Sequence, residues 1–441
     1  MNIKLNNFKE IASNIIKLSL PILGGNISQI LVSISDTVVA GRYSTVALGA
    51  VSVAAAIVMT ITIGAIGLVM SVSPVIANFR GAKIPSKKYF KLTLLFSILV
   101  SIPFFLLVEL LITKIGLIGL SEDLVEPVKT YLVVCAWTVF PSAIFVALKE
   151  FLQAFEKVVF ANVLMLFMVL LNVVLNVVLA FGFNFGSLHI PEMGVLGLSL
   201  ATLISKTFVA VFMILYCIPL FKAPFENSNK YVKDLFKTGL PISCAMFFEF
   251  LGFNLTAVLI GKFSALFAGV HNIVLCVANF TFMIALSISS ATSIKIGFFN
   301  GKKDKENIIS YGLISVIIVV AVCCVSFIFL EIFQNQIIQL FSKDPEVLFW
   351  SKKILKIALC FLFFDGLQCA FVGILKGLKD TKIIMFTMLT AYLLIAIPFG
   401  SYCAFHLGRV LEGYWIGLAL ALSFAAVVTG TRVVKNIRKM Q

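Results

Sequence analysis

Long hydrophobic segments alternate with short charged segments along the whole chain. Each hydrophobic segment has about 20 or more mainly apolar residues, the length that an α-helix needs to cross a bilayer. Lipid offers the backbone no hydrogen-bond partners, so such segments are expected to be helical. We predict twelve membrane-spanning helices, at residues 15–40, 46–78, 92–113, 128–151, 158–182, 194–221, 238–260, 267–297, 308–333, 350–375, 383–405 and 413–431.

Composition leads to the same fold class. The chain of 441 residues is 61% hydrophobic and only 12% charged, with a mean hydropathy of +1.09. A water-soluble protein of this size needs more polar surface than these residues provide. The sequence therefore predicts an all-α membrane protein.

The net charge of +15 is explained by the loops. Most lysines and arginines fall on the side of the membrane that holds both chain termini and the polar segment 222–237. Because positively charged loops stay in the cytoplasm, we expect both termini to be cytoplasmic. The same bias explains the positive charge without nucleic acid, and we expect no nucleic-acid partner.

The two halves of the sequence resemble each other at an offset of 220 residues. Residues identical to those 220 positions later include Lys17, Leu20, Pro21, Ile22, Gly41, Gly49, Ser73, Gly81 and Lys83. Six helices in each half make the repeats parallel, as in many transporters. We predict an N-lobe at 1–221, a cytoplasmic linker at 222–237 and a C-lobe at 238–441. These lobes would be pseudo-symmetric six-helix bundles around a central cavity.

Three acids fall inside predicted spanning helices: Asp36, Glu249 and Asp365. A carboxylate in the bilayer core costs about 2.5 to 3.5 kcal/mol, so each needs a partner or a function. One interpretation is a structural hydrogen bond to a neighbouring helix. The other is a site for a cation or a proton, because burial and a second nearby carboxyl group favour proton uptake.

Helical spacing groups further polar residues with these acids. Glu249 shares a helix face with Thr256, and Asp365 shares one with Gln368. In the first predicted helix, Asn26, Gln29, Ser33 and Asp36 lie on one face. We interpret that face as lining a cavity, although Asp36 near Arg42 also fits an acid at the membrane interface.

Other candidate positions leave alternatives open. Asn172 and Asn176 lie four residues apart and supply amide oxygens for a hard cation, or they pack against a neighbouring helix. Lys206 fits snorkelling, pairing with an acid, or contact with substrate. Pro21 and Pro241 are hinge candidates or ordinary first-turn prolines. Among the 43 phenylalanines, Phe248 and Phe361 are candidates for stacking on flat cationic substrates.

Several motifs, in order through both halves, resemble the multidrug and toxin extrusion (MATE) family, specifically its bacterial NorM-like branch. The first predicted helix carries Ser35-Asp36-Thr37, and the eighth carries His271-Asn272 and Phe282-Met283-Ile284-Ala285-Leu286-Ser287. Further matches are Gly194-Val195, Ala201-Thr202, Asp380-Thr381 and Gly413-Tyr414-Trp415. The resemblance covers nearly the whole chain, with Asn272 and Ala285 departing from the usual Gln and Pro.

The resemblance implies a multidrug exporter of the bacterial inner membrane, driven by Na⁺ or H⁺. Asp36, Asn172, Asn176 and Thr202 match an N-lobe cation site, where Na⁺ would bind Asp36, Asn172 and Asn176. Glu249 and Asp365 match C-lobe acids that couple transport to a cation or proton. Phe361 stands where sodium-coupled relatives can have Tyr, which leaves the C-lobe sodium site incomplete.

The combined expectation is a secondary active antiporter that exports organic, mainly cationic, drugs. The substrate-cavity candidates are Gln29, Ser33, Phe248, Thr256, Phe361 and Gln368. The alternative within the superfamily is a flippase for lipid-linked oligosaccharides or polysaccharides, but three membrane acids against Lys206 favour a cationic substrate. No nucleophile or metal constellation indicates an enzyme, and buried acids in a repeat favour coupled transport over a passive channel. We expect a monomer in the lipid bilayer that needs no cofactor beyond the coupling ion.

Overall fold

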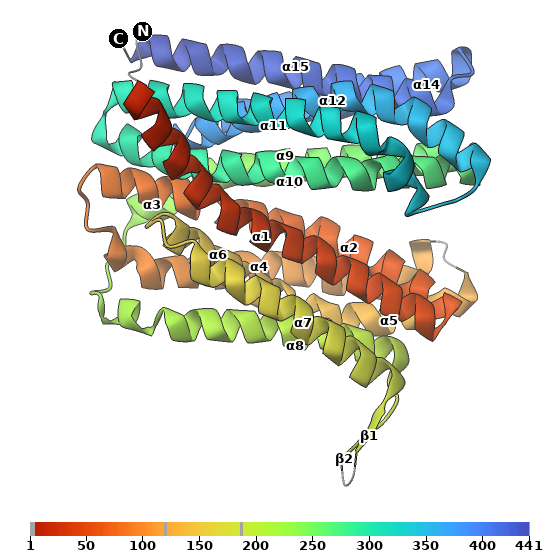
Figure 1. The fold of residues 1–441 in the computed structure, drawn as a ribbon. Coiled ribbons are helices and arrows are strands. Elements are labelled where there is room, and N and C mark those ends of the chain that lie inside the picture. Colours follow the sequence, from red (N-terminus) through yellow and green to blue (C-terminus); the bar gives the residue numbers. More distant parts are fainter. Residues whose placement is uncertain (1–4, 119–120, 186–187, 441) are drawn as a thin grey trace. The chain divides into compact units, whose positions relative to one another are not determined.

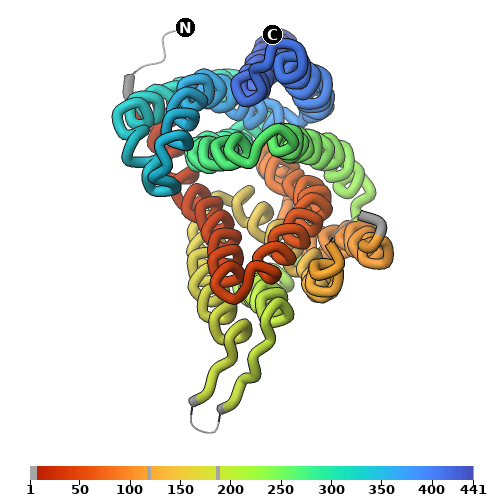
Figure 2. Tube along the Cα trace, turned by 90° about the vertical axis from the view of Figure 1, so that its right-hand side faces the viewer, coloured from red at the N-terminus to blue at the C-terminus, as the bar shows by residue number. Residues whose placement is uncertain are grey.

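The computed structural model describes residues 5–118, 121–185 and 188–440, and almost all of them are helical (Figure 1). Eleven helices in this part of the chain are long and apolar enough to span a membrane, and twelve if the bent pair α5 and α6 forms one span. This number confirms the predicted all-helical membrane fold. The described residues also include a two-stranded antiparallel hairpin, β1 (Phe183–Phe185) with β2 (Leu188–Ile190). It lies between the end of α7 and the start of α8 (Figures 1 and 2).

The helices of the first half follow the predicted order. They are α1 (Leu5–Tyr43), α2 (Thr45–Val69), α3 (Val72–Gly81), η1 (Ser86–Tyr89), α4 (Phe90–Thr113), η2 (Ile115–Ile118), α5 (Glu122–Ala136), α6 (Val139–Gln153), α7 (Val159–Phe181), α8 (Gly194–Tyr216) and η3 (Ile218–Lys222). The polar N-terminal segment continues into the first spanning helix. The predicted fourth helix is instead the pair α5 and α6, which is bent by 41°.

Five helices of the second half are at least 30 residues long. The elements of this half are α9 (Asn229–Gly261), α10 (Ala265–Lys302), α11 (Lys305–Gln339), α12 (Pro345–Gly377), α13 (Lys382–Leu389), the π-helical segment η4 (Thr390–Ala396), α14 (Ile397–His406) and α15 (Val410–Lys439). The predicted eleventh span is thus α13, η4 and α14 in sequence. Its π turn is wider than an α turn and changes which side chains share a face.

The chain forms two compact units. The N-unit comprises Gly24–Ile76 and Pro85–Ser243, and the C-unit comprises Met1–Leu23, Ala77–Ile84 and Cys244–Gln441. Both α1 and α9 therefore contribute to both units. The points of change, after Leu23 and after Ser243, lie 220 residues apart and two residues beyond Pro21 and Pro241.

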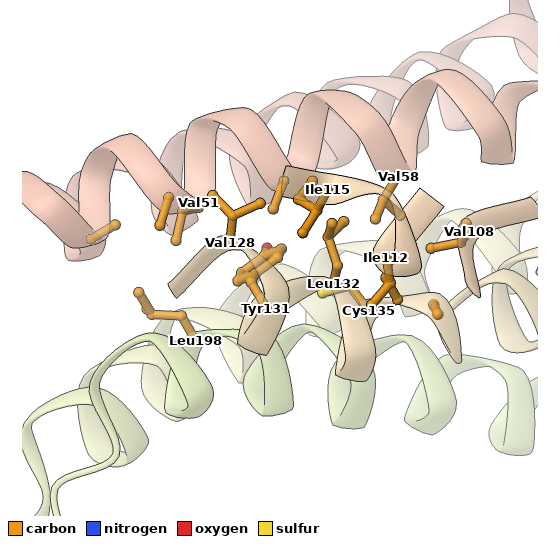
Figure 3. Close-up of a cluster of buried hydrophobic side chains, with 14 of the residues drawn as sticks. Val51, Val58, Val108, Ile112, Ile115, Val128, Tyr131, Leu132, Cys135 and Leu198 are labelled. Atoms are coloured by element: carbon orange, nitrogen blue, oxygen red, sulfur yellow. The ribbon is translucent and has the colours of Figure 1, made fainter. Parts of the chain in front are cut away.

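The core of the N-unit is an apolar cluster between α2, α4, α5 and α8 (Figure 3). Its centre includes Val51, Val128, Leu132 and Leu198, all no more than 2% exposed. Tyr131 and Cys135 of α5 belong to the same cluster. This packing holds α5 beside α8.

The C-unit is organised around α12, which packs against α10, α11 and α15. Glycines allow the close approach: a β-carbon on Gly373 would lie 2.6 Å from the carbonyl oxygen of Ser289 in α10. Small residues at such crossings are how helices pack in lipid, where no hydrophobic driving force brings them together. The centre of α12, including Asp365, is therefore buried.

Candidate functional site

The N-unit buries a carboxylate among neutral polar side chains from three helices. Asp36 of α1 is 9% exposed, and Asn172 and Asn176 of α7 are fully buried. The Asn176 amide nitrogen donates to Asp36 Oδ1 at 2.7 Å and to Asn172 Oδ1 at 3.1 Å. The Thr202 hydroxyl of α8 donates to Asp36 Oδ2 at 3.4 Å. The structure thus brings together all four residues of the predicted N-lobe site.

Two amide atoms in this cluster have no hydrogen-bond partner. They are Asn176 Oδ1 and Asn172 Nδ2, both buried. Rotation of the Asn176 amide by half a turn would exchange its nitrogen and oxygen. The oxygen would then face Asp36 Oδ1 and Asn172 Oδ1, forming a group of oxygens of the kind that a hard cation prefers.

A positive charge lies near the same carboxylate. Lys206 of α8 follows Thr202 by four residues, which places both side chains on one helix face. Its ammonium group donates to the Thr138 hydroxyl at 3.5 Å and lies within electrostatic range of Asp36 and Cys135. This placement fits a through-space interaction of Lys206 with Asp36, while its hydrogen bond goes to Thr138. The i, i+4 spacing to Thr202 was a sequence signal for it.

Tyr131 is a further neighbour that the sequence did not indicate. This residue of α5 is 3% exposed, and it interacts with Thr202 and lies within electrostatic range of Asp36. Figure 3 shows its ring among the apolar side chains of the N-unit core. Nothing in the pattern distinguishes Tyr131 from any other aromatic residue of an apolar helix.

The remaining polar residues of the predicted α1 face lie apart from the cluster. Gln29 and Ser33 are exposed, whereas Asp36 is buried toward α7. The Ser33 carbonyl accepts a hydrogen bond from Thr37 of the same helix at 2.9 Å. The face is therefore split between a buried carboxylate and exposed polar side chains.

The C-unit holds the other two acids. Glu249 of α9 is half-buried, and Asp365 of α12 is 5% exposed. The two carboxyl groups lie within electrostatic range of each other. Asp365 Oδ1 and Gln368 Oε1 have no hydrogen-bond partner, and the Gln368 amide nitrogen makes only a weak contact, 3.6 Å, with Met388 Sδ. The structure thus brings Glu249, Asp365 and Gln368 into one polar region.

The other C-lobe candidates have different surroundings. Phe361 is buried, and its ring packs on Phe253 at 6.1 Å and Trp415 at 5.5 Å between centroids. The buried Thr256 hydroxyl donates to the Gly252 carbonyl of its own helix at 2.9 Å. Phe248 is half-buried.

Both hinge candidates lie well inside long helices. Pro21 is within α1, which begins at Leu5, and Pro241 is within α9, which begins at Asn229. The interpretation as ordinary first-turn prolines is therefore wrong. It failed because polar residues before each proline resembled a loop, whereas they form the first turns of the helix.

Protein-family comparisons support a transporter fold. The MatE family profile matches residues 21–178 and 241–401, two matches that begin 220 residues apart. The chain is 28% identical over 446 residues to the probable multidrug resistance protein NorM of Photorhabdus laumondii, covering 96% of this chain and 95% of that protein. It is 26% identical to the multidrug resistance protein NorM of Vibrio cholerae, covering 97% and 96%.

A solved structure shows the same fold. The crystal structure of the eukaryotic MATE transporter AtDTX14 superposes with a TM-score of 0.85 at 20% identity, covering 98% of each chain. At this identity the likeness concerns the fold, and the site residues are not carried over from it.

Proposed function

The chain belongs to the MATE family of multidrug transporters, and on this premise we propose that it exports organic cations in exchange for Na⁺ or H⁺ by alternating access. The single observation that carries the coupling is Asp36, a carboxylate 9% exposed and held by Asn176 and Thr202. A carboxylate inside the membrane needs a partner or a function, and we infer that this one exchanges a cation or a proton during transport.

For the N-lobe site we propose Na⁺. The candidate oxygens are those of Asp36, Asn172, Asn176 and Thr202, that is, one carboxylate, two amides and a hydroxyl. The unpartnered Asn176 oxygen is the atom that an amide rotation would bring toward the ion. In this scheme the Asn176 amide nitrogen satisfies the carboxylate without Na⁺, and its oxygen binds Na⁺ in the loaded state.

Lys206 supplies a fixed positive charge near this site. Because it lies within electrostatic range of Asp36, the carboxylate is already partly compensated. A fixed counter-charge weakens cation binding, which suits an ion that must leave again. We propose that Lys206 sets the affinity for Na⁺ in this way.

For the C-lobe acids we propose proton exchange. Glu249 and Asp365 lie within electrostatic range of each other in a buried region, where two carboxylates cannot both carry charge at low cost. Phe361 offers no oxygen to them. A proton needs no cage of oxygens, so this pair suits proton exchange better than sodium binding.

The substrate class follows from charge. Three acids, Asp36, Glu249 and Asp365, lie at these sites against two lysines, Lys206 near Asp36 and Lys376 near Glu249, and this balance favours cationic over anionic substrates. Gln29, Ser33, Phe248, Thr256, Phe361 and Gln368 stay proposed cavity residues. We propose that the protein works as a monomer in the bacterial inner membrane, with both termini in the cytoplasm.

The test is dye efflux from proteoliposomes with Na⁺ and pH gradients imposed separately. Purified wild-type protein should expel a preloaded cationic dye when either an inward Na⁺ gradient or an inward proton gradient is present. A fluorescent lipid-linked oligosaccharide should not change leaflets in the same vesicles. Lipid translocation without dye efflux would contradict the proposal and favour the flippase alternative.

A further inference from the structure

Tyr392 lies in the π-helical segment η4 and is fully buried in the C-unit. π turns within α-helices are rare overall, and those that occur often lie at functional sites. Its ring rests against α9 at Gly252, where a β-carbon would come within 2.7 Å of the Tyr392 ring. Gly252 follows Glu249 by three residues, so the two share a face of α9. The missing side chain at Gly252 therefore makes room for Tyr392 beside Glu249.

The Tyr392 hydroxyl has no hydrogen-bond partner although it is buried. It lies within interaction range of the Glu249 and Asp365 carboxyl groups, without the geometry of a formed hydrogen bond. Asp365 Oδ1 is also without a partner. A buried donor and a buried acceptor that lie in the same region without hydrogen bonds are rare in folded proteins and call for an explanation.

Phe253 packs against both Tyr392, which carries this hydroxyl, and Phe361, which stands where sodium-coupled relatives can have a tyrosine. The Phe253 ring packs on Tyr392 at 5.3 Å and on Phe361 at 6.1 Å between centroids. The rings of Phe361 and Tyr392 thus pack on a common neighbour. A phenol oxygen is therefore present in this region, but η4 supplies it and α12 does not. The fifth span of each half contributes to a site, because Asn172 and Asn176 lie on α7, the corresponding span of the N-unit.

We propose that Tyr392 is a positioning residue of the C-lobe site, whose hydroxyl donates a hydrogen bond to the Glu249 and Asp365 pair when that pair is charged. A donated hydrogen bond stabilises a carboxylate, so Tyr392 sets the pH at which the pair releases its proton. This inference rests on the proposed proton exchange at the two acids. It adds the residue that tunes that exchange.

Other titratable groups also surround the site. From α12, Cys369 acts on Tyr392, and Lys376 acts on Glu249. From α11, Cys323 lies within range of Asp365. From α10, the buried His271 ring packs on Trp415 of α15 at 5.6 Å. Because Tyr392→Phe leaves all of these groups in place, its effect isolates the hydroxyl.

The experiment is an infrared pH titration of the protonated-carboxyl band in the purified protein. Glu249→Gln and Asp365→Asn assign the band. Tyr392→Phe should move the midpoint to higher pH by about one unit, the size expected for one hydrogen bond to a charged group. Tyr402→Phe, an exposed tyrosine of α14, should leave the midpoint unchanged. Adding Phe361→Tyr to Tyr392→Phe supplies a phenol oxygen from α12 and should restore the wild-type midpoint.

A second variant covers the case in which Tyr392→Phe fails to fold. Gly252→Ala displaces the ring while keeping the hydroxyl, and it should shift the midpoint in the same direction. An unchanged midpoint in the folded variants would overturn the role of Tyr392. If the midpoint shifts but no variant or wild-type protein exports dye, the proposed export is wrong while the role of Tyr392 stands.

Discussion

Asn176 donates a 2.7 Å hydrogen bond to Asp36 across 140 residues of sequence, joining α7 to α1. The bond satisfies one oxygen of a carboxylate that is costly in lipid without partners. The same amide nitrogen also contacts Asn172, so three polar side chains form one hydrogen-bonded group. Perturbation of any member therefore changes the environment of the proposed coupling charge.

Asp36→Asn should abolish sodium-driven efflux while the protein still inserts and folds, because the charge that Na⁺ must balance is gone. Asn176→Ala should weaken it by about 10-fold or more, as expected for loss of one oxygen ligand and one hydrogen bond to a charged group. The measurement is the initial rate of dye efflux against Na⁺ concentration. Glu331→Gln is the matched control, since this acid is exposed on α11. Equal loss in the control would mean that the acids are not specific to coupling.

Lys206→Met should raise the affinity for Na⁺. Removing a positive charge in electrostatic range of Asp36 leaves the carboxylate uncompensated, so the Na⁺ concentration for half-maximal efflux should fall by about 10-fold. Maximal efflux should fall too, because the ion leaves more slowly. Lys206→Arg keeps the charge and should resemble the wild type in Na⁺ affinity. A higher half-maximal concentration in Lys206→Met would contradict the counter-charge role.

Gly81 and Gly301, repeat partners in the C-unit, should not tolerate alanine. A β-carbon on Gly81 would collide with the carbonyl of Phe298, and one on Gly301 with the carbonyl of Asn78. Helix propensity alone would make each change favourable by about 1 kcal/mol, so the clash predicts the opposite sign. Thermal unfolding in detergent measures it. Gly269→Ala in the same helix as Gly301 meets nothing within 4 Å and should be neutral or stabilising.

Asp380, between α12 and α13, should stabilise the fold only above acidic pH. Burial raises the pKa of this carboxyl, but hydrogen bonds from Arg432 and Asn436 outweigh it and hold the pKa below its usual value. Arg432 Nε donates at 2.6 Å and Nη2 at 3.2 Å. A lowered pKa adds stability above the unfolded-state value, about 3.9, that is lost as pH falls through the folded-state value.

Asp380→Asn should therefore lower the free energy of unfolding by about 1 kcal/mol at pH 7, since both side chains are partly exposed and solvent screens the pair. The difference from the wild type should shrink as the pH falls below the unfolded-state value, about 3.9, and vanish once the pH is below the folded-state value. Thermal unfolding over a series of pH values from 7 downward measures it. A difference that persists undiminished in acid would show that the carboxylate charge is not the cause.

Much of the N-lobe site was predictable because helical spacing places its polar residues on common helix faces. Asn172 and Asn176 lie four apart, and their polarity in an apolar segment marks them. Tyr392 was not predictable, because its place depends on a π turn and on the space at Gly252, and neither follows from periodicity. The split between exposed Gln29 and buried Asp36 also required the packing of α1 on α7, since spacing alone assigns both to one face.

The helix boundaries show the same distinction. The order and number of spans follow from hydropathy, which reports transfer to lipid. The bend between α5 and α6, at Trp137 and Thr138, comes just before Pro141, which has no backbone N–H to donate to the carbonyl of Trp137, so the sequence did carry a signal for it. The early start of α1 was missed because its polar first turns carry no lipid signal, although they are helical.

The central claim is that substrate and ion movements are coupled through Asp36, and coupling must work in both directions. The direct measurement is the release of radioactive Na⁺ from dye-free, protein-containing vesicles, at equal Na⁺ concentration inside and outside and clamped pH, after a cationic dye is added outside. We predict that dye entry drives Na⁺ out of the vesicles although Na⁺ has no concentration gradient, and that Asp36→Asn abolishes this flux. Dye entry without any movement of Na⁺ in the wild-type protein would contradict sodium coupling at Asp36.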